Sequence, residues 1–369
     1  MELGIWILGF DPAGIIPDRR LLNQCIDRAR HRKPAEVVEW LGAVQAQEYE
    51  PAKWGLGLRM ANAVDADVER AFEQGRILRT HVMRPTWHFV TPGDIRWMLE
   101  LTAPSVHRRM AVYDRQLGLD AAVKRRGTAV IERALRDGQH LTRVELGERL
   151  KDAGLAFTST RLAHLAMYAE LEGVVCSGPR RGRKFTYALM AERAPKARRL
   201  PRDEALAELA RRFFTSHGPA TVRDFVWWSG LTTADARRGL EMIRAKRHDV
   251  GDHIYWAAGV AAKAPASVRI AHLLPIYDEF VVAYRDRVAV PHGPSMIPSS
   301  TGGGYVTFQH ALVVAGQIAG TWRLSRSSSG VAIAATPLRR LSPKERSAVT
   351  DAAARYGRFA NLPVELSIA

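Results

Sequence analysis

The sequence predicts an α+β fold that is mostly α-helical, with three successive helical units followed by a small β-rich unit. In most of the first 262 residues, apolar side chains recur at helical spacing, and hydroxyl caps recur at the start of corresponding helices. After that point, short β-type runs alternate with Gly, Pro and Ser. A chain of 369 residues exceeds one compact core, and we expect domains at 15–125, 126–198, 199–262 and 263–369.

The first unit is expected to contain three helices and a β-ribbon. Apolar residues recur near every 3.6 positions around 21–26 and 35–41, and a third helix is expected over 53–60. The run 77–90 alternates and is rich in Thr, Val, Trp and Phe, which favours a hairpin with Pro85 at an edge or turn. This order is the outline of a winged helix.

The second and third units repeat that outline around related helix caps. Thr142 and Glu145 have the spacing of a capping box, and Thr221 and Asp224 occupy the same place in the next unit. In the second unit, a helix over 157–172 is followed by two strand-like runs joined by a basic turn. We therefore predict three tandem winged-helix motifs.

The last part of the chain is expected to form a small β-barrel-like unit and one helix. The short strand-like runs are 270–274, 305–308, 312–314, 317–324 and 330–335. The Pro- and Gly-rich segment 291–304 is expected to be a loop. Ser342, Pro343 and Glu345 form a capping box for a helix that runs to about Tyr356.

The charge balance points to a polyanionic partner. The chain has 54 Lys and Arg against 38 Asp and Glu, a formal net charge of +16. Arg enrichment also follows from genome base composition, so charge alone does not identify that partner. No run reaches the ~18 apolar residues of a membrane span, and the apolar start at 4–10 is a poor signal peptide. Two cysteines are too few for a disulfide framework, so we expect a cytoplasmic, nucleoid-associated protein.

The most informative segment is Gln45-Ala46-Gln47, at the end of an apolar helix. From its composition alone, a glutamine pair at such a position is most simply solvated surface. However, this stretch and the later run from His81 to Val90 resemble the AlkZ/YcaQ family of DNA glycosylases. The segments 218–231 and 274–287 also match the habits of that family, in the same order.

This resemblance implies three winged helices and a β-barrel around a basic channel, and excision of N7-alkylated purines from double-stranded DNA. It also implies that crosslinks are unhooked, and that some relatives give self-resistance to a DNA-alkylating natural product. The family motif is Gln, an apolar residue, then Gln or Asp. Gln45-Ala46-Gln47 has the double-Gln form, which lacks the carboxylate that would be an obvious general base.

The chemistry tolerates that loss because an N7-alkylated guanine is cationic and already a good leaving group. The enzyme must stabilise an oxocarbenium-like sugar and position a water molecule. We expect Gln45 to act on the water and sugar, with Gln47 as its partner. Lys53 is the nearest lysine, about two helical turns away, so a monofunctional mechanism without a Schiff base is expected. No cofactor or metal is predicted, since no HExxH or Cys-x-x-Cys occurs. A site that binds a cationic base is also expected to be poor in positive charge.

Further residues are also candidates for the site. Arg84 and His88 are expected near the lesion or its flanking phosphates, although an edge-strand His and a surface Arg are the simpler alternative. Trp87 and Phe89 are expected in the core, on the face opposite His88. Trp227-Trp228 is interpreted as packing, and one carboxylate of Asp278-Glu279 as structural. The residues expected to contact DNA are Lys53, Arg180, Arg181, Arg183, Lys184, Arg285 and Arg287.

The main alternative is a winged-helix transcription regulator without catalysis. Such regulators usually dimerise to read palindromic half-sites, and the sequence offers no coiled coil for this purpose. We therefore expect a monomer whose three units contact one duplex.

Overall fold

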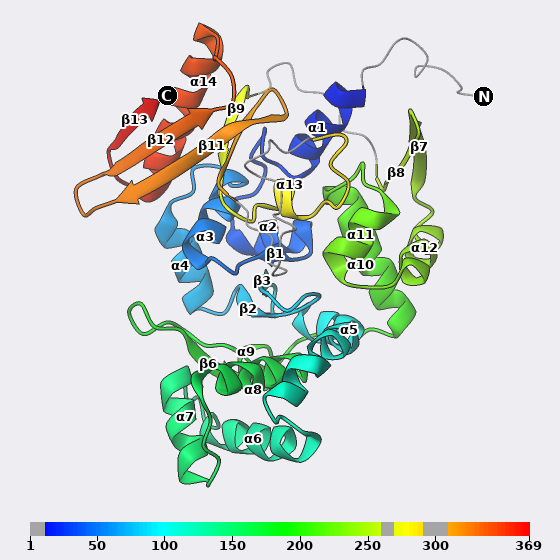
Figure 1. Ribbon diagram of the computed structural model, residues 1–369, viewed down its shortest axis with the longest axis vertical. Helices are drawn as coiled ribbons and strands as arrows, with labels where there is room; N and C mark the ends of the chain where they lie inside the picture. Colours follow the sequence, from blue (N-terminus) through cyan, green and yellow to red (C-terminus); the bar gives the residue numbers. More distant parts are fainter. Residues whose placement is uncertain (1–11, 260–268, 291–308) are drawn as a thin grey trace.

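The computed structural model describes residues 12–259, 269–290 and 309–369. Figure 1 shows a first helical unit in the middle of the molecule, a second below it, a third at the right and a β-sheet at the upper left. The apolar run 4–10, the loop expected at 291–304 and the strand expected at 305–308 lie outside the described residues.

The first unit combines three helices with a small antiparallel sheet. After α1 (Pro12–Asn23), it contains α2 (Pro34–Leu41), β1 (Val44–Gln45), α3 (Tyr49–Leu58), α4 (Asp65–Glu73), β2 (Leu78–His81) and β3 (Trp87–Val90). The strand order is β1-β3-β2, so β3 lies in the centre. The hairpin was expected, but α4 was not. Only Val68, Ala71 and Phe72 of α4 are buried, which leaves little apolar pattern in its sequence.

The second unit repeats this order. A long helix, α5 (Ile95–Gln116), leads into α6 (Ala121–Ala134), β4 (Leu141–Thr142), α7 (Arg143–Asp152), α8 (Ser159–Leu171), β5 (Val175–Ser177) and β6 (Thr186–Leu189), and α9 (Met190–Arg193) follows. The strand order is β4-β6-β5. The expected capping box is present, because the Thr142 hydroxyl accepts a hydrogen bond from the Glu145 N–H and the Glu145 carboxylate accepts one from the Thr142 N–H.

The third unit has the same order with a shorter sheet. It contains α10 (Arg202–Ser216), α11 (Val222–Ser229), α12 (Thr233–Met242), β7 (Lys246–Val250) and β8 (His253–Ala257). A single bridge between Ala220 and Trp256 takes the place of the first strand. The capping box of Thr221 and Asp224 is formed. Strand β7 was not expected, because its polar sequence and its exposure give no alternating apolar pattern.

The C-terminal part is an open sheet covered by one helix. It contains β9 (Ala271–Leu274), α13 (Glu279–Val282), β10 (Ala311–Val314), β11 (Gln317–Arg326), β12 (Val331–Pro337), α14 (Pro343–Ala360) and β13 (Val364–Ile368). The strand order is β13-β12-β11-β10-β9, so the described strands do not close into the expected barrel. After α14 crosses over, β13 pairs parallel with β12 and extends the sheet instead of joining β9.

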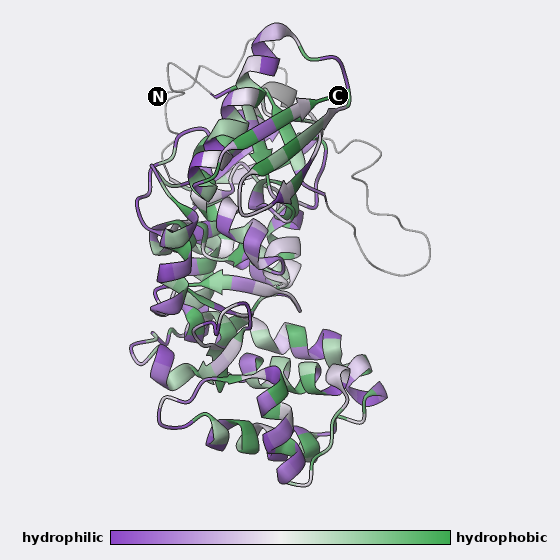
Figure 2. Ribbon diagram, turned by 90° about the vertical axis from the view of Figure 1, so that its left-hand side faces the viewer, coloured by the Kyte–Doolittle hydropathy of each residue, from purple (hydrophilic) through white to green (hydrophobic). Residues whose placement is uncertain are grey.

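The hydrophobic core ties the first unit to its neighbours but leaves the second unit partly separate. One buried cluster joins the first unit to the C-terminal sheet, and another joins its hairpin to α5 and the third unit. A third cluster lies within the second unit. In Figure 2, hydrophobic residues are found in the upper, middle and lower parts of the molecule. In the described chain, no helix has the length and apolar character that a membrane crossing would require.

Candidate active site

The glutamine segment lines a cleft of about 900 Å³ between the first and third units. Its walls come from the first unit, α5, α11, α12, and α13 with the segments on either side of it. The lining residues are Gln45, Gln47, Arg84, Pro85, Thr86, Arg109, Arg223, Val226, Trp227, Thr233, Tyr277, Val282 and Arg285. The structure thus brings together four of the residues selected from the sequence, namely Gln45, Gln47, Arg84 and Arg285.

Strand pairing sets the direction of Gln45. Strand β1 pairs antiparallel with β3, and in this register Gln45 lies opposite His88 while Val44 lies opposite Phe89. Directly opposed residues of an antiparallel pair project from the same face. Val44 and Phe89 enter the hydrophobic core, so Gln45 and His88 project together from the other face.

Buried charged groups hold both the backbone and the side chain of Gln45. Its backbone N–H donates to Glu279 Oε1 over 2.8 Å, and its side-chain Oε1 accepts from Arg84 Nη2 over 2.8 Å. Only 6% of Gln45 is exposed. An amide oxygen has two lone pairs, so the bond from Arg84 leaves one acceptor position on Gln45.

Arg84 and His88 form the support of the Gln45 side chain. Arg84 Nη2 lies 3.3 Å from His88 Nε2, and His88 Nδ1 lies 2.9 Å from the Thr86 carbonyl oxygen. This arrangement fits a neutral imidazole that donates through Nδ1 and accepts through Nε2. Burial, followed by the charge of Arg84, lowers the pKa of His88 well below its ordinary value. Burial lowers the pKa of Arg84 to about 10, so Arg84 remains a cation at neutral pH.

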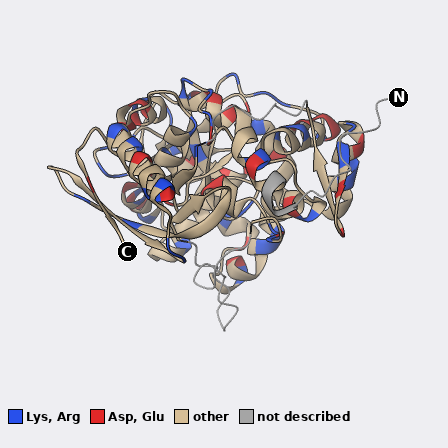
Figure 3. Cartoon of the chain, turned by 90° about the horizontal axis from the view of Figure 1, so that it is seen from above, with Lys and Arg blue, Asp and Glu red and all other residues tan. Residues whose placement is uncertain are grey.

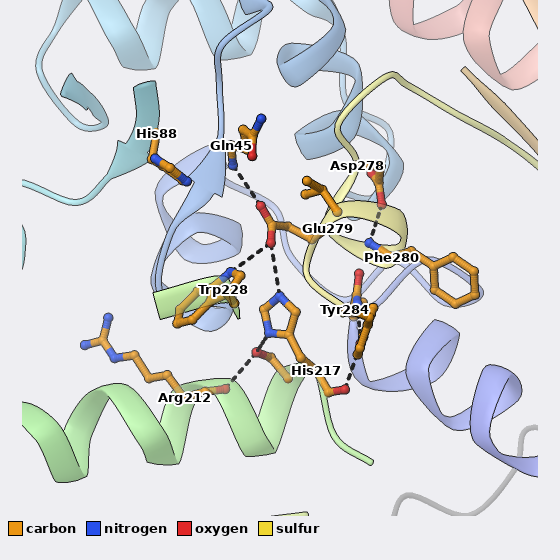
Figure 4. Close-up of polar contacts among 12 residues, drawn as sticks. Gln45, His88, Arg212, His217, Trp228, Asp278, Glu279, Phe280 and Tyr284 are labelled. Atoms are coloured by element: carbon orange, nitrogen blue, oxygen red, sulfur yellow. Dashed lines mark hydrogen bonds and ion pairs between the residues drawn. The ribbon is translucent and has the colours of Figure 1, made fainter. Parts of the chain in front are cut away.

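Beneath Gln45 lies Glu279, which is only 1% exposed. Figure 4 shows Glu279 between the Gln45 backbone on one side and Trp228 and His217 on the other. Its Oε2 accepts from Trp228 Nε1 over 3.0 Å and lies 3.4 Å from His217 Nε2. Burial pushes the pKa of Glu279 upward, but His217, Arg84 and the Gln45 N–H outweigh it, and the net shift is downward. Glu279 is therefore a carboxylate that anchors the glutamine segment.

Asp278 has a separate structural role. It accepts two hydrogen bonds from Arg59, of 2.8 and 2.9 Å, and both side chains are 1% exposed. Both carboxylates of the Asp278-Glu279 pair are thus buried supports, whereas the sequence indicated this role for one. Sequence reasoning missed Glu279 as the anchor of Gln45, because 234 positions separate the two residues and no local pattern links them.

Gln47 is held less tightly than Gln45. Its Oε1 accepts from the backbone N–H of Trp87 over 3.3 Å, and its own carbonyl accepts from Arg79 over 3.3 Å. The side chain is half-buried at the edge of the cleft. Both glutamines therefore have a fixed carbonyl group within one cleft. In the part of the chain that the structure describes, no group of three His, Cys, Asp or Glu side chains is arranged to hold a metal ion.

The expected DNA contact of Lys53 is contradicted by the structure. Lys53 is 2% exposed, and its Nζ forms ion pairs with Glu50, Asp65 and Glu69 at 2.7, 2.9 and 2.9 Å. A buried, neutralised ammonium group cannot reach a phosphate without losing these partners. Lys53 instead joins α3 to α4.

The basic turn between β5 and β6 contains two arginines that form ion pairs and two further cations. Arg180 forms ion pairs with Glu69 at 2.7 Å and Glu50 at 3.4 Å, and Arg181 pairs with Glu145. Arg183 and Lys184 are exposed and line a second cleft, of about 800 Å³, between the first and second units. Arg181 is exposed as well, but its guanidinium is held by Glu145, so Arg183 and Lys184 are the better candidates for contact with DNA.

Trp87 also departs from its expected place. Phe89 is fully buried, as predicted, but Trp87 is half-buried and lines the second cleft. The Arg79 guanidinium lies 4.3 Å from the centre of its ring. Trp87 therefore marks the boundary between the two clefts, since its backbone N–H contacts Gln47 of the first cleft.

The third-unit side of the glutamine cleft carries Arg285 and Trp227. Arg285 is exposed, and its guanidinium lies 5.4 Å from the centre of the Trp227 ring. Trp227 thus lines the cleft, while its neighbour Trp228 packs in the core as the sequence indicated. Arg287 is half-buried and donates to the Val281 carbonyl, outside the lining of this cleft.

The expectation of a site poor in positive charge is wrong. The lining of the cleft includes Arg84, Arg109, Arg223 and Arg285, and no carboxylate is found among its described lining residues. These arginines come from four separate segments, so the sequence could not show that they converge. Elsewhere in the described part of the chain, Lys and Arg are interspersed with Asp and Glu (Figure 3), whereas the described lining of this cleft contains only cationic charged residues.

His88 makes the stability of the fold depend on pH. The pKa of His88 is lower in the folded chain than in the unfolded one. The contribution of His88 to the free energy of unfolding is therefore fully present above about pH 6.5 and declines as the pH falls below that value. We expect the wild-type protein to lose up to about 1.4 kcal/mol per pH unit from this group. Urea unfolding at pH 7.5 and 5.5 measures the loss. His88→Gln, which does not titrate, should show a smaller loss, and an equal loss in both proteins would contradict the assignment.

The fold is that of a solved DNA glycosylase. The structure of the Streptomyces sahachiroi DNA glycosylase AlkZ superposes with a TM-score of 0.78 at 23% sequence identity, and the match covers 98% of this chain and 100% of that one. Residues 38–359 match the model of the family described as "DNA glycosylase AlkZ-like". The chain therefore belongs to the AlkZ-like DNA glycosylase family.

A curated relative is named for its role in repair. It is the "Interstrand DNA cross-link repair glycosylase" of Streptomyces sahachiroi, which is 27% identical over 242 residues. The aligned region spans 64% of this chain and 64% of that relative.

Proposed function

We propose that the protein is a monofunctional DNA glycosylase that hydrolyses the N-glycosidic bond of N7-alkylated purines in double-stranded DNA. The observation that carries the proposal is the glutamine pair, fixed by Arg84, Glu279 and the Trp87 backbone in a cleft with four arginines. Membership of the AlkZ-like family supports the same activity.

In the proposed reaction, the bond between C1′ and the purine N9 breaks first. Its electron pair moves into the ring system and neutralises the N7-alkyl cation, so the base leaves without prior protonation. The sugar becomes oxocarbenium-like, and the free lone pair of Gln45 Oε1 orients a water molecule toward C1′. The water oxygen then bonds to C1′ and its proton passes to solvent, which leaves an abasic site. No described residue lining the cleft is a lysine, in keeping with a mechanism without a Schiff base.

The cleft arginines have a separate role in this proposal. Arg109, Arg223 and Arg285 are exposed, and guanidinium groups bind phosphate oxygens in bidentate geometry. We assign them to the phosphates that flank the lesion. The cationic base then meets the two amides, while the arginines contact the anionic backbone.

The repeated order of helix, short strand or bridge, two helices and hairpin supports three winged helices that bind one duplex. We propose four domains close to the expected divisions at 15–125, 126–198, 199–262 and 263–369, but the first boundary must lie before α6 (Ala121–Ala134), because that helix begins the second repeat. Interstrand crosslinks are proposed as substrates, because the curated relative is named for their repair. Self-resistance to an alkylating natural product, the monomeric state and the cytoplasmic, nucleoid-associated location remain predictions.

The test is release of the free base from defined substrates. The protein is incubated with duplexes that contain N7-methylguanine, an N7 crosslink or no lesion, and the released purine is identified by mass spectrometry. We expect release from the alkylated duplexes only, with alkali-labile abasic sites in the product. Sequence-specific binding to undamaged operator DNA without base release from any N7 adduct would favour the transcription regulator and overturn the glycosylase.

Arg183 and Lys184 should contribute salt-dependent affinity. Each phosphate contact releases counterions, so replacement of one contact residue by alanine should reduce the magnitude of the slope of log K against log salt by about 1. The measurement is fluorescence anisotropy with an undamaged duplex between 50 and 200 mM salt. Lys344→Ala, an exposed lysine on α14, is the control. Unchanged slopes in both turn variants would remove this turn from the proposed interface.

A further inference from the structure

We propose that Tyr277 presents its aromatic ring to the positively charged purine, so that this residue selects alkylated over neutral bases. The inference rests on the proposed function and adds a residue that determines specificity. Tyr277 was not among the site residues selected from the sequence. It follows β9 and lines the same cleft as Gln45 and Gln47.

The backbone of Tyr277 is held in an unfavourable conformation. Its φ is +62°, in the left-handed region that residues other than glycine rarely adopt. Such conformations cost about 1–3 kcal/mol, persist only where surrounding contacts enforce them, and cluster at functional sites. Here the next two residues supply those contacts, because Asp278 is fixed by Arg59 and Glu279 by Trp228 and the Gln45 N–H.

These contacts link Tyr277 directly to the glutamine segment. The residue two positions after Tyr277 bonds to the backbone of Gln45, so the two cleft walls are joined through one buried carboxylate. The Tyr277 side chain is half-buried and packs against the core cluster that joins the first unit to the C-terminal sheet. Contacts of the neighbouring backbone and of the side chain therefore both place Tyr277 in the cleft wall.

The chemistry of the ring suits a cationic ligand. Burial, and then the nearby Glu48, raises the pKa of the Tyr277 hydroxyl, so the ring remains a neutral phenol at physiological pH. The face of a phenol ring attracts cations through its quadrupole. The cleft already contains one example, in which the Arg285 guanidinium lies over Trp227. An N7-alkylpurine offers a delocalised, planar cation of the same kind, whereas an unmodified purine is neutral.

The experiment compares binding of a charged and a neutral base in otherwise identical DNA. The two probes are duplexes with 2′-fluoro-N7-methylguanosine or 2′-fluoroguanosine, in which the fluorine prevents hydrolysis. The measured quantity is the dissociation constant of the neutral probe divided by that of the charged probe. Tyr277→Leu should reduce this ratio about 3- to 30-fold, and Tyr277→Phe should keep it within about twofold.

All three side chains carry a Cβ atom, so the backbone cost at this position is the same in each protein. Tyr168→Leu is the control, since Tyr168 is also half-buried but lies in the second unit, where Lys124 covers its ring at 4.8 Å. If Tyr277→Leu does not fold, as judged by its unfolding curve, Tyr277→Met replaces it as the non-aromatic variant.

The inference is overturned if the leucine or methionine variant keeps the wild-type ratio, or weakens binding of both probes equally. Base release from a hydrolysable N7-methylguanine duplex by the wild-type protein is measured in parallel. Release by the wild type with an unchanged ratio in the variant refutes the role of Tyr277 alone. Absence of release by the wild type refutes the proposed function itself.

Discussion

Gln45→Ala is expected to lower the single-turnover rate of base release about 100- to 1,000-fold. A loss of this size is typical when one preorganised dipole is removed from an active site. Arg84 fixes the Gln45 oxygen and Glu279 fixes its backbone, so the amide needs no reorganisation when charge develops on the sugar. The measurement is a single-turnover time course with an N7-methylguanine duplex and enzyme in excess.

The controls separate catalysis from folding and binding. Gln139→Ala removes an exposed glutamine of the second unit and should leave the rate unchanged. DNA affinity of Gln45→Ala should stay close to that of the wild type, because the arginines that we assign to phosphate contacts are retained. A rate within tenfold of the wild type in Gln45→Ala would exclude a direct role for this amide in the reaction.

Asp278→Ala is expected to reduce the free energy of unfolding by about 3–5 kcal/mol. Arg59 is 1% exposed and donates two hydrogen bonds, of 2.8 and 2.9 Å, to the Asp278 carboxylate, which balances its charge. Removal of the carboxylate leaves a buried guanidinium without its counter-ion. This destabilises the fold more than replacement of both partners by apolar residues would, because an uncompensated charge stays buried. Equilibrium unfolding in urea measures the change.

A surface pair provides the comparison. Arg247 and Asp249 also form an ion pair, at 2.7 Å, but their side chains are 54% and 60% exposed. Asp249→Ala should therefore cost less than about 1 kcal/mol. Similar losses in the two variants would show that burial does not determine the strength of the Arg59–Asp278 pair.

The sequence predicts the parts of this fold that depend on neighbouring residues. Helix caps such as Thr142 with Glu145 and Ser342 with Glu345 are formed as expected, because the residues of a capping box lie three positions apart. The hairpin around Pro85 follows in the same way from local alternation. The open C-terminal sheet could not be predicted, since its topology depends on where β13 pairs after α14.

The site shows the same limit. Gln45 and Gln47 were selected from a motif, and Arg84 from the later run His81 to Val90, because both stretches resemble the AlkZ/YcaQ family. Lys53 was misassigned, since two of its partners, Asp65 and Glu69, lie on the next helix. The convergence of the cleft arginines and the anchor under Gln45 depends on contacts between distant segments, which no local pattern reveals.

The bond between the Gln45 N–H and Glu279 has a consequence for the newly made protein. The two residues are 234 positions apart, so the ribosome must synthesise most of the chain before this bond can form. At 5–20 residues per second, the interval is roughly 10–50 s. During that time, the first unit has left the ribosome with its glutamines but without the carboxylate that orients them. We expect nascent chains and fragments that end before Glu279 to be inactive on DNA, so that activity begins only once Glu279 has been made and has bonded to the Gln45 backbone.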